Sequence, residues 1–241
     1  MGSRTRAAMK SAYQNKLGDA PAKKGGATEQ AYLQIKNMIY YNEVVPGQKL
    51  IYQDLAKRLN ISVTPVIQAL NRLVEHSNLV RHESNRGYFV GEITETEARE
   101  LYEAREALEI YMIPLIIKNI NPKALNSIRE AFREPISPAL PQYRRLILLK
   151  DTQFHLRMAE YAHNSVLLRM LTGIFEQIYL KYPPEYLTDT RVKSHAKEHR
   201  AVLDAIRRGD IDKATSFIKE HIRTGLDYVV ATLHADKVMI G

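Results

Sequence analysis

Two residues four positions apart on a predicted helix could bind one metal ion together. Asp151 and His155 would share a helix face, because residues at i and i+4 lie one above the other. His199 and His221 lie on two later amphipathic stretches, where each would face inward with apolar neighbours. One carboxylate and three imidazoles suit a divalent transition metal such as Zn²⁺, Ni²⁺, Mn²⁺ or Fe²⁺. The alternative is that these are ordinary histidines on helix surfaces.

A second group of polar side chains could read double-stranded DNA. In a helix-turn-helix, the second helix lies in the major groove and its first residues reach the base edges. Here that helix would start at Ser62, and its outward side chains would be Ser62, Thr64, Gln68 and Asn71, with Arg72 further along. The preceding helix offers Gln53, Lys57 and Arg58 to the phosphate backbone, and a later hairpin offers Asn85, Arg86 and Gly87.

The elements that would position these side chains begin with three short helices. Apolar residues recur at helical spacing from Thr28, and a second helix fits Tyr52 to Leu59. Asn60 suits the left-handed position that ends this helix. Ser62 would cap the third helix, and Pro65 is tolerated in its first turn, where a missing N–H loses no intrahelical bond. Two strand-like runs follow, near residues 79–81 and 87–90, with a polar turn between them. This order of elements predicts a winged helix-turn-helix.

The rest of the chain has helical patterns only. Thr94–Glu97 reads as a capping box at the start of a long helix. One side of that helix would carry Leu101, Ala104, Leu108, Tyr111, Met112 and Leu115. Further amphipathic stretches run near 122–134, 138–162, 165–181, 191–208 and 211–234. Asn121-Pro122 and Gly209-Asp210 provide the stop and start signals between them. The fold class is therefore mainly α: an N-terminal winged helix-turn-helix and a C-terminal six-helix antiparallel bundle.

Composition sets the domain limits and excludes several classes of protein. The chain has 241 residues and a net charge of +8, and much of the excess lies in residues 1–26, which we read as a disordered basic tail. A DNA-binding domain would span 27–93, a helical domain 94–234, and a short C-terminal tail 235–241. The absence of cysteine excludes disulfides and thiolate metal sites. No apolar run is long enough to cross a membrane, so we expect a cytoplasmic protein.

The segment from Leu55 to Leu73 resembles the helix-turn-helix of the GntR superfamily of bacterial regulators, and Asn85–Val90 is similar to its wing. Two positions depart from the family pattern, because Val63 and Ile67 stand where that family usually has arginines that contact DNA. Arginine pairs strongly with guanine, so we expect an atypical operator that is richer in A·T pairs. The alternative is a module retained for assembly that binds DNA weakly.

The helical part is similar to the FCD effector domain of the FadR subfamily, in its six-helix VanR-like branch. Asp151–His155 matches that domain's Asp-x-x-x-His motif, Glu198–Asp210 matches its Glu-His segment, and His221 stands at its final histidine ligand. The resemblance therefore implies a metal held by Asp151, His155, His199 and His221. Glu103–Glu109 is similar to a Glu-x-Arg-x-x-Leu-Glu stretch, which would make Arg105 an effector-binding residue with a bidentate grip on a carboxylate. In that role Arg105 would point inward. The alternative is that Arg105 only pairs with Glu103 or Glu109.

These features together predict a homodimeric transcription regulator whose affinity for a DNA operator changes when a small carboxylate effector binds at the metal. The other histidines, His76, His82, His163, His195 and His234, are expected to be surface or packing residues, and His195 to miss the ion. A metal-dependent enzyme is the alternative function, because open coordination positions could activate water. Against it, the chain has no HExxH segment and no glycine-rich phosphate loop. A purely structural metal is the third possibility.

Overall fold

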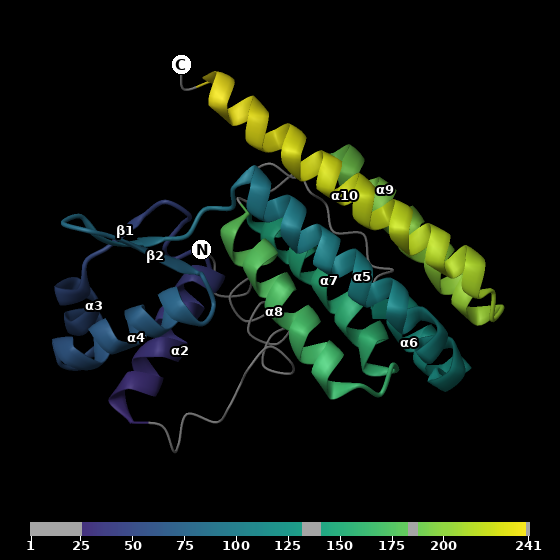
Figure 1. Cartoon of the computed structure of the whole chain (residues 1–241), viewed down its shortest axis with the longest axis horizontal. Helices are drawn as coiled ribbons and strands as arrows, with labels where there is room; N and C mark the ends of the chain where they lie inside the picture. The colour runs from purple at the N-terminus through teal and green to yellow at the C-terminus, as the bar shows by residue number, and fades with distance from the viewer. Residues whose placement is uncertain (1–25, 132–140, 183–187, 240–241) are drawn as a thin grey trace. The chain divides into compact units, whose positions relative to one another are not determined.

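The computed structural model of this chain describes residues 26–131, 141–182 and 188–239 (Figure 1). The predicted basic tail lies outside these residues, apart from Gly26. Two compact units make up the chain, and the boundary between them falls between Ile93 and Thr94.

Three helices and a small sheet form the N-terminal unit. The elements are α2 (Ala27–Tyr40), β1 (Lys49–Leu50), α3 (Tyr52–Leu59), α4 (Val63–Glu75), β2 (Val80–Glu83) and β3 (Gly87–Val90). The sheet is antiparallel in the order β1-β3-β2, and Lys49 pairs with Phe89 while Val80 pairs with Val90. Strand β1 was not predicted, because two residues are too few to show an alternating pattern. The winged helix-turn-helix is confirmed.

Local sequence signals account for the turn between α3 and α4. Asn60 adopts the left-handed conformation with φ of 53°, which ends α3 as expected. Ser62 stands at the N-cap of α4, although its side chain makes no capping hydrogen bond. The buried face of α4 carries Val66, Leu70 and Leu73, which are fully buried and pack towards α2. The opposite face of α4 is therefore left outside the core of this unit.

Helices alone form the C-terminal unit in the described residues. They are α5 (Glu95–Asn119), α6 (Pro122–Ala131), α7 (Pro141–Glu160), α8 (Ser165–Lys181), α9 (Asp189–Arg207) and α10 (Ile211–Met239). The long helices run side by side as a bundle, with α10 against both α5 and α9 (Figure 1). Helix α10 continues beyond residue 234, where the sequence predicted a tail. No helix in the described part of the chain is long and apolar enough to cross a bilayer.

The predicted helix starts carry the expected caps. Thr94 Oγ1 accepts a hydrogen bond from the N–H of Glu97 at 3.2 Å, as a capping box requires. Asn121 Oδ1 accepts from the N–H of Ala124 at 2.9 Å, which starts α6. Asp210 Oδ1 accepts from the N–H of Lys213 at 3.0 Å, which starts α10. These side chains satisfy backbone donors that a helix leaves without partners in its first turn.

The apolar side of α5 is only partly buried. Met112 is buried, but Ala104 is exposed and Tyr111 is 63% exposed. The residues that α5 buries include Tyr102, Arg105 and Glu109. The buried face is therefore partly charged, and an apolar stripe of the same helix is left at the surface of the unit. Hydrophobic periodicity identified the helix correctly but not the side that faces the core.

Replacing Thr94 with alanine removes the side-chain acceptor at the start of α5. We expect Thr94→Ala to lower the free energy of unfolding of the helical unit by about 1 kcal/mol. Urea denaturation followed by far-UV circular dichroism measures the change.

Thr96→Ala is the matched control, because Thr96 is exposed in the same turn of α5. Alanine has the higher helix propensity, so this variant should lose no stability. Equal losses in the two variants would show that the cap does not stabilise α5.

Candidate functional site

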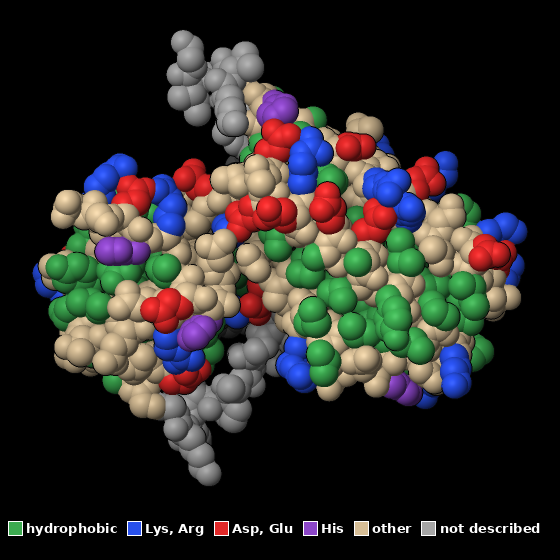
Figure 2. Space-filling view, viewed as in Figure 1, with side chains coloured by type: hydrophobic (Ala, Val, Ile, Leu, Met, Phe, Trp, Pro, Cys, Tyr) green, Lys and Arg blue, Asp and Glu red, His purple; other side chains and the backbone are tan. Residues whose placement is uncertain are grey.

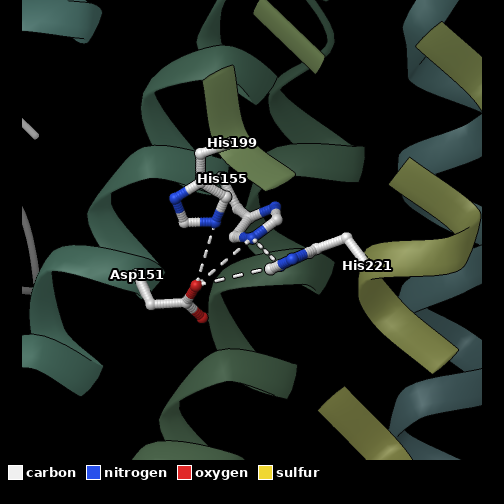
Figure 3. Close-up of side chains that lie close together, drawn as sticks. All are labelled: Asp151, His155, His199 and His221. Atoms are coloured by element: carbon white, nitrogen blue, oxygen red, sulfur yellow. Dashed lines mark hydrogen bonds and ion pairs between the residues drawn. The ribbon is translucent and has the colours of Figure 1, made fainter. Parts of the chain in front are cut away.

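The acidic and imidazole side chains singled out in the sequence converge inside the helical unit. Asp151, His155, His199 and His221 each present one ligand atom, and these atoms all lie within 4.8 Å of one another. Figure 3 shows the three imidazole rings turned towards the Asp151 carboxylate. Oδ1 of Asp151 lies 3.1 Å from Nε2 of His199, 3.7 Å from Nε2 of His155 and 3.8 Å from Nε2 of His221.

Three helices contribute these side chains. Asp151 and His155 share one face of α7, as their four-residue spacing predicts, and α9 and α10 supply His199 and His221. The three histidines are buried and Asp151 is mostly buried. Phe154 stacks on the His199 ring with centroids 3.8 Å apart, which fixes the plane of that imidazole. The packing of three helices, rather than a loop, therefore holds the ligand atoms in place.

Two glutamates orient two of the imidazoles. Oε2 of Glu109 accepts a hydrogen bond from Nδ1 of His155, and Oε2 of Glu198 accepts one from Nδ1 of His221, each at 2.6 Å. A carboxylate acceptor places the ring proton on Nδ1, so the lone pair of each ring sits on Nε2 and faces the cluster. Carboxylates that bond the outer nitrogen of metal-binding histidines in this way fix the ring and raise its basicity.

Arg105 lies directly beside the cluster and is fully buried with it. Its Nε donates to Oε1 of Glu109 at 2.6 Å, and its Nη2 lies 2.7 Å from Nε2 of His155 and 3.5 Å from Nε2 of His221. The expected pairing with Glu109 is therefore present, whereas Glu103 is exposed. Nη2 donates to the lone pair of His155 when that ring is neutral. A cation bound to this nitrogen would have to displace the guanidinium.

Burial keeps two of the imidazoles neutral at pH 7. It lowers the pKa of His199 to about 4, and burial with the charges of His199 and His155 holds the pKa of His221 well below its usual value. Burial would raise the pKa of Asp151, but the charge of His195 and hydrogen bonds from the histidines outweigh it and hold the pKa far below normal. The carboxylate is therefore ionised and two lone pairs are free of protons, which is the state that metal binding requires.

The donor set fits a divalent transition metal. Metal–ligand bonds of about 2.0–2.2 Å put two ligands of one ion at most about 4.4 Å apart. The separations of the three Nε2 atoms from Asp151 Oδ1 fall inside this limit, and the widest pair of ligand atoms, at up to 4.8 Å, needs a small contraction. Oδ1 of Asp151 is also buried, with imidazole nitrogens of His199 and His195 at 3.1 and 3.3 Å but no hydrogen bond of regular geometry among the residues described. A cation at this position would give the buried oxygen a well-placed partner.

His195 lies closer to the cluster than the sequence suggested. Its Nδ1 is 3.3 Å from Oδ1 of Asp151, although it is not one of the residues whose ligand atoms converge. The remaining histidines, His76, His82, His163 and His234, are exposed, as expected. His195 therefore holds the Asp151 carboxylate rather than standing on the surface.

The expected DNA-reading side chains of α4 are mostly open to solvent. Ser62, Thr64, Gln68 and Asn71 are exposed, as are Gln53, Lys57 and Arg58 of α3 and Asn85 and Arg86 of the wing. Gly87 is partly buried, with a φ of 93°. Two side chains of α4 have partners in their own unit: Gln68 accepts from Thr28 at 2.6 Å, and Asn71 accepts from Tyr88 at 2.7 Å.

Arg72 is held by the first helix. Its Nη1 donates to Glu29 at 2.6 Å, and its guanidinium lies 4.5 Å from the ring centroid of Tyr32. The structure therefore gives Arg72 a role in joining α4 to α2. Sequence spacing could not show this, because Glu29 precedes Arg72 by 43 positions.

Sequence reasoning missed the residues that support the cluster. Glu109 and Glu198 orient imidazoles on other helices, and Arg191 in turn donates to Oε1 of Glu198 at 2.8 Å. A local signal existed for Glu109 only, which stands four residues after Arg105 on one helix face. Contacts between different helices leave no such spacing in the chain.

Comparison with protein families places known domains on both units. The model of the FCD domain matches residues 100–224, and the model of bacterial regulatory proteins of the gntR family matches residues 27–90. The two matches correspond to the helical bundle and to the winged helix-turn-helix.

Curated relatives of the chain are bacterial regulators. The uncharacterized HTH-type transcriptional regulator YdhC of Bacillus subtilis is 22% identical, over 86% of this chain and 93% of the relative. The Nta operon transcriptional regulator of Aminobacter aminovorans is 25% identical, over 77% of this chain and 86% of the relative. Among solved structures, E. coli McbR/YncC has the same fold, with a TM-score of 0.67 and 21% identity over 87% of this chain and 99% of that one.

Protein stripped of metal should lose stability as the pH falls from 6.5 to 4. In this window the unfolded chain binds protons at His199 and His221 while the folded protein does not, so acid favours unfolding. The pKa of His155 is raised, so its contribution to stability is complete below pH 6.5 and is lost only at higher pH. The pKa of Asp151 is lowered, so its contribution to stability is lost only below pH 3.8. Urea denaturation at several pH values, with a chelator present, measures the slope.

His199→Asn should flatten this pH profile, because asparagine removes the titrating group and keeps a polar side chain of similar reach. His76→Gln is the control, since His76 is exposed in the other unit and its loss should leave the slope unchanged. A profile for His199→Asn as steep as that of the wild type would contradict the assignment.

Proposed function

This chain belongs to the GntR family of bacterial transcription regulators and carries the FCD domain, and we propose that a small carboxylate bound at its metal centre sets its affinity for DNA. The observation that carries the proposal is the convergence of Asp151, His155, His199 and His221 within 4.8 Å, inside the unit that is not the DNA-binding one. No observation favours the alternative of a metal-dependent enzyme.

The metal would be held by one carboxylate oxygen and three imidazole nitrogens, which suits Zn²⁺, Ni²⁺, Mn²⁺ or Fe²⁺. When bound, the ion supplies a positive charge and open coordination positions to an anionic ligand. Glu109 and Glu198 keep the Nε2 lone pairs of His155 and His221 directed at the cluster. Their buried negative charge also offsets part of the charge that an ion brings into the helical unit.

Arg105 would bind the carboxylate of the effector. Its guanidinium is planar and buried, and Glu109 fixes one side of it at 2.6 Å. When a cation takes the lone pair of His155, Nη2 of Arg105 loses its acceptor and must find another. A carboxylate beside the ion supplies that acceptor, which gives the ligand two attachments in a buried site.

Helix α4 would read the operator. Thr64, Gln68 and Asn71 present hydroxyl and amide groups on its exposed face, and amides of this kind pair with adenine in the major groove. Val63 and Ile67 supply methyl groups that can contact thymine. Lys57 and Arg58 of α3 would contact phosphates, which position the protein without reading sequence. This set of side chains favours an operator with A·T pairs.

A homodimer accounts for the apolar surface of the helical unit. The apolar stripe of α5 leaves Ala104 and Tyr111 exposed, and Val166 and Met170 of α8 are each more than half exposed. Hydrophobic side chains gather over the helical unit where α8 is drawn (Figure 2). Exposed apolar patches of this kind mark interaction surfaces. A second copy would cover the patch and give a symmetric pair of α4 helices for a palindromic operator.

Control of DNA binding would then follow from linkage. A carboxylate that binds one arrangement of the dimer more tightly than another shifts the population towards it. The change in DNA affinity equals the difference in the ligand's affinity for the two arrangements. The helical unit would bind the carboxylate, and the winged helix-turn-helix would bind DNA with the changed affinity.

Substitutions on α3 and α4 should separate base reading from phosphate binding. Gln68→Ala should relax preference at one position of each half-site, by roughly 1–3 kcal/mol of discrimination. Lys57→Ala should weaken binding to all sequences alike and reduce the salt slope by about 1. Selection from a random DNA pool gives the operator, and fluorescence anisotropy at several salt concentrations gives the affinities.

Lys213→Ala is the matched control for charge, because Lys213 is an exposed cation of the helical unit. It should leave the salt slope of DNA binding unchanged. No enrichment of any sequence at low salt would overturn the DNA-binding proposal.

His199→Ala and His221→Ala should each abolish tight Zn²⁺ binding and the response to carboxylates while DNA binding remains. The measurement is operator affinity with and without a panel of two- to six-carbon carboxylic acids, on Zn²⁺-loaded and chelator-treated protein. His234→Ala, which changes an exposed histidine of the same unit, is the control. If the first two variants respond as the wild type does, the sensor proposal is wrong. A purely structural ion would instead raise the melting temperature while no acid altered DNA affinity.

A further inference from the structure

A second buried guanidinium in the helical unit uses only part of its hydrogen-bonding capacity. Arg191 near the start of α9 is 5% exposed. Its Nη1 donates to Oε1 of Glu198 at 2.8 Å and to Oγ of Ser194 at 3.0 Å. Its Nε and Nη2 are buried and have no hydrogen-bond partner in the described part of the chain. Leaving buried donors of a charged group without a hydrogen-bond partner costs free energy, so these two atoms are suited to bind an anionic ligand.

The unpaired atoms form one edge of the guanidinium. Nε–H and Nη2–H point in parallel from the same side of the planar group, and this fork matches the two oxygens of a carboxylate. Glu198 occupies the other nitrogen, so it holds the plane of Arg191 fixed and leaves the fork free. The arrangement is that of a preformed anion clamp rather than of a saturated structural ion pair.

A glycine borders the space beside this edge. Gly225 lies in the interior of α10, one turn after His221. A Cβ at Gly225 would lie 3.6 Å from Nη2 of Arg191, 3.6 Å from Oη of Tyr102 and 3.2 Å from its Cε1. Glycine is unfavourable inside a helix, so its presence here needs a packing reason. An alanine Cβ would crowd the Tyr102 ring and lie beside the Arg191 fork, so glycine lets both side chains approach α10 closely.

This space adjoins the metal centre. Tyr102 precedes Arg105 by one turn of α5, and the Arg105 guanidinium lies 5.5 Å from the centroid of the Tyr102 ring. Glu198 joins the two sites directly, because its second oxygen accepts from Nδ1 of His221 at 2.6 Å. Arg105 and Arg191 therefore both lie near Tyr102.

We propose that the effector is a dicarboxylate, with one carboxylate at the metal centre and Arg105 and the other on the Nε–Nη2 fork of Arg191. The inference rests on the proposed function, which supplies the first attachment. Two buried cations on either side of Tyr102 match two negative charges on one ligand. A monocarboxylate would leave the Arg191 fork unpaired, so it would bind more weakly than a diacid long enough to reach both.

The test compares diacids with monoacids of the same carbon number. Calorimetry on the full-length, Zn²⁺-loaded chain, free of excess ion, measures the binding affinity of each acid. The diacids are malonate, succinate, glutarate and adipate, and their partner monoacids are propionate, butyrate, pentanoate and hexanoate. We expect at least one diacid to bind roughly tenfold or more tightly than its partner acid. The preferred diacid gives the distance between the two attachments.

Substitution of Arg191 tests which residue provides the second attachment. Arg191→Lys keeps a cation for Glu198 but lacks the planar fork, so the preference for the diacid should fall to within about threefold. Gly225→Ala leaves both arginines in place and puts a methyl group beside the fork, so it should also reduce the preference. Arg200→Lys, an exposed arginine of the same helix, should keep the wild-type ratio. Far-UV circular dichroism and Zn²⁺ stoichiometry confirm that each variant is folded.

The outcomes distinguish this inference from the proposed function. If monoacids bind and no diacid is favoured by more than about threefold, the Arg191 assignment fails and the metal-centre sensor stands. A diacid preference that persists in both Arg191→Lys and Gly225→Ala overturns the assignment as well. If no acid of either series binds while Zn²⁺ does, both the carboxylate sensor and the dicarboxylate inference fall.

Discussion

The helical unit depends on the burial of charges that neutralise one another. Glu109 lies at the centre of this arrangement, because its two oxygens hold Arg105 and His155 at 2.6 Å each. Burial would raise the pKa of Glu109, but His155 and Arg105 outweigh it and keep the carboxyl ionised. A buried ion pair adds little stability compared with apolar packing, and removing one partner leaves an uncompensated charge. The charges are therefore better explained by what the unit binds than by how it folds.

That arrangement determines the surface of the unit as well as its interior. Because α5 turns Arg105 and Glu109 inward, its apolar stripe with Tyr111 is left at the surface. The side chains that build the site and those that would meet a second copy thus lie on two faces of one helix. Under the proposed function, a ligand that shifts Arg105 would act on the same helix that carries the proposed dimer surface.

In the winged helix-turn-helix, the apolar and polar residues of α4 lie on opposite faces of the helix. Its apolar residues Val66, Leu70 and Leu73 fill the core, and its polar residues remain on the opposite face of α4. Arg72 is the exception, because Glu29 and Tyr32 draw its side chain towards α2. With arginine absent at positions 63 and 67, the exposed face of α4 presents amide, hydroxyl and methyl groups. Such groups distinguish base pairs by shape and hydrogen bonding more than by charge.

The sequence by itself determined the elements and the types of ligand. Helix spacing, Asn60, Thr94 and Gly209-Asp210 located the helix ends, because these are local effects of backbone geometry and capping. The four-residue spacing of Asp151 and His155 put two ligands on one face for the same reason. Only the tertiary structure decided how much of the apolar stripe of α5 stays exposed and which carboxylate holds which imidazole. It also revealed the open fork of Arg191. These depend on contacts between helices that are far apart in the chain, and no periodicity within one helix records its neighbours.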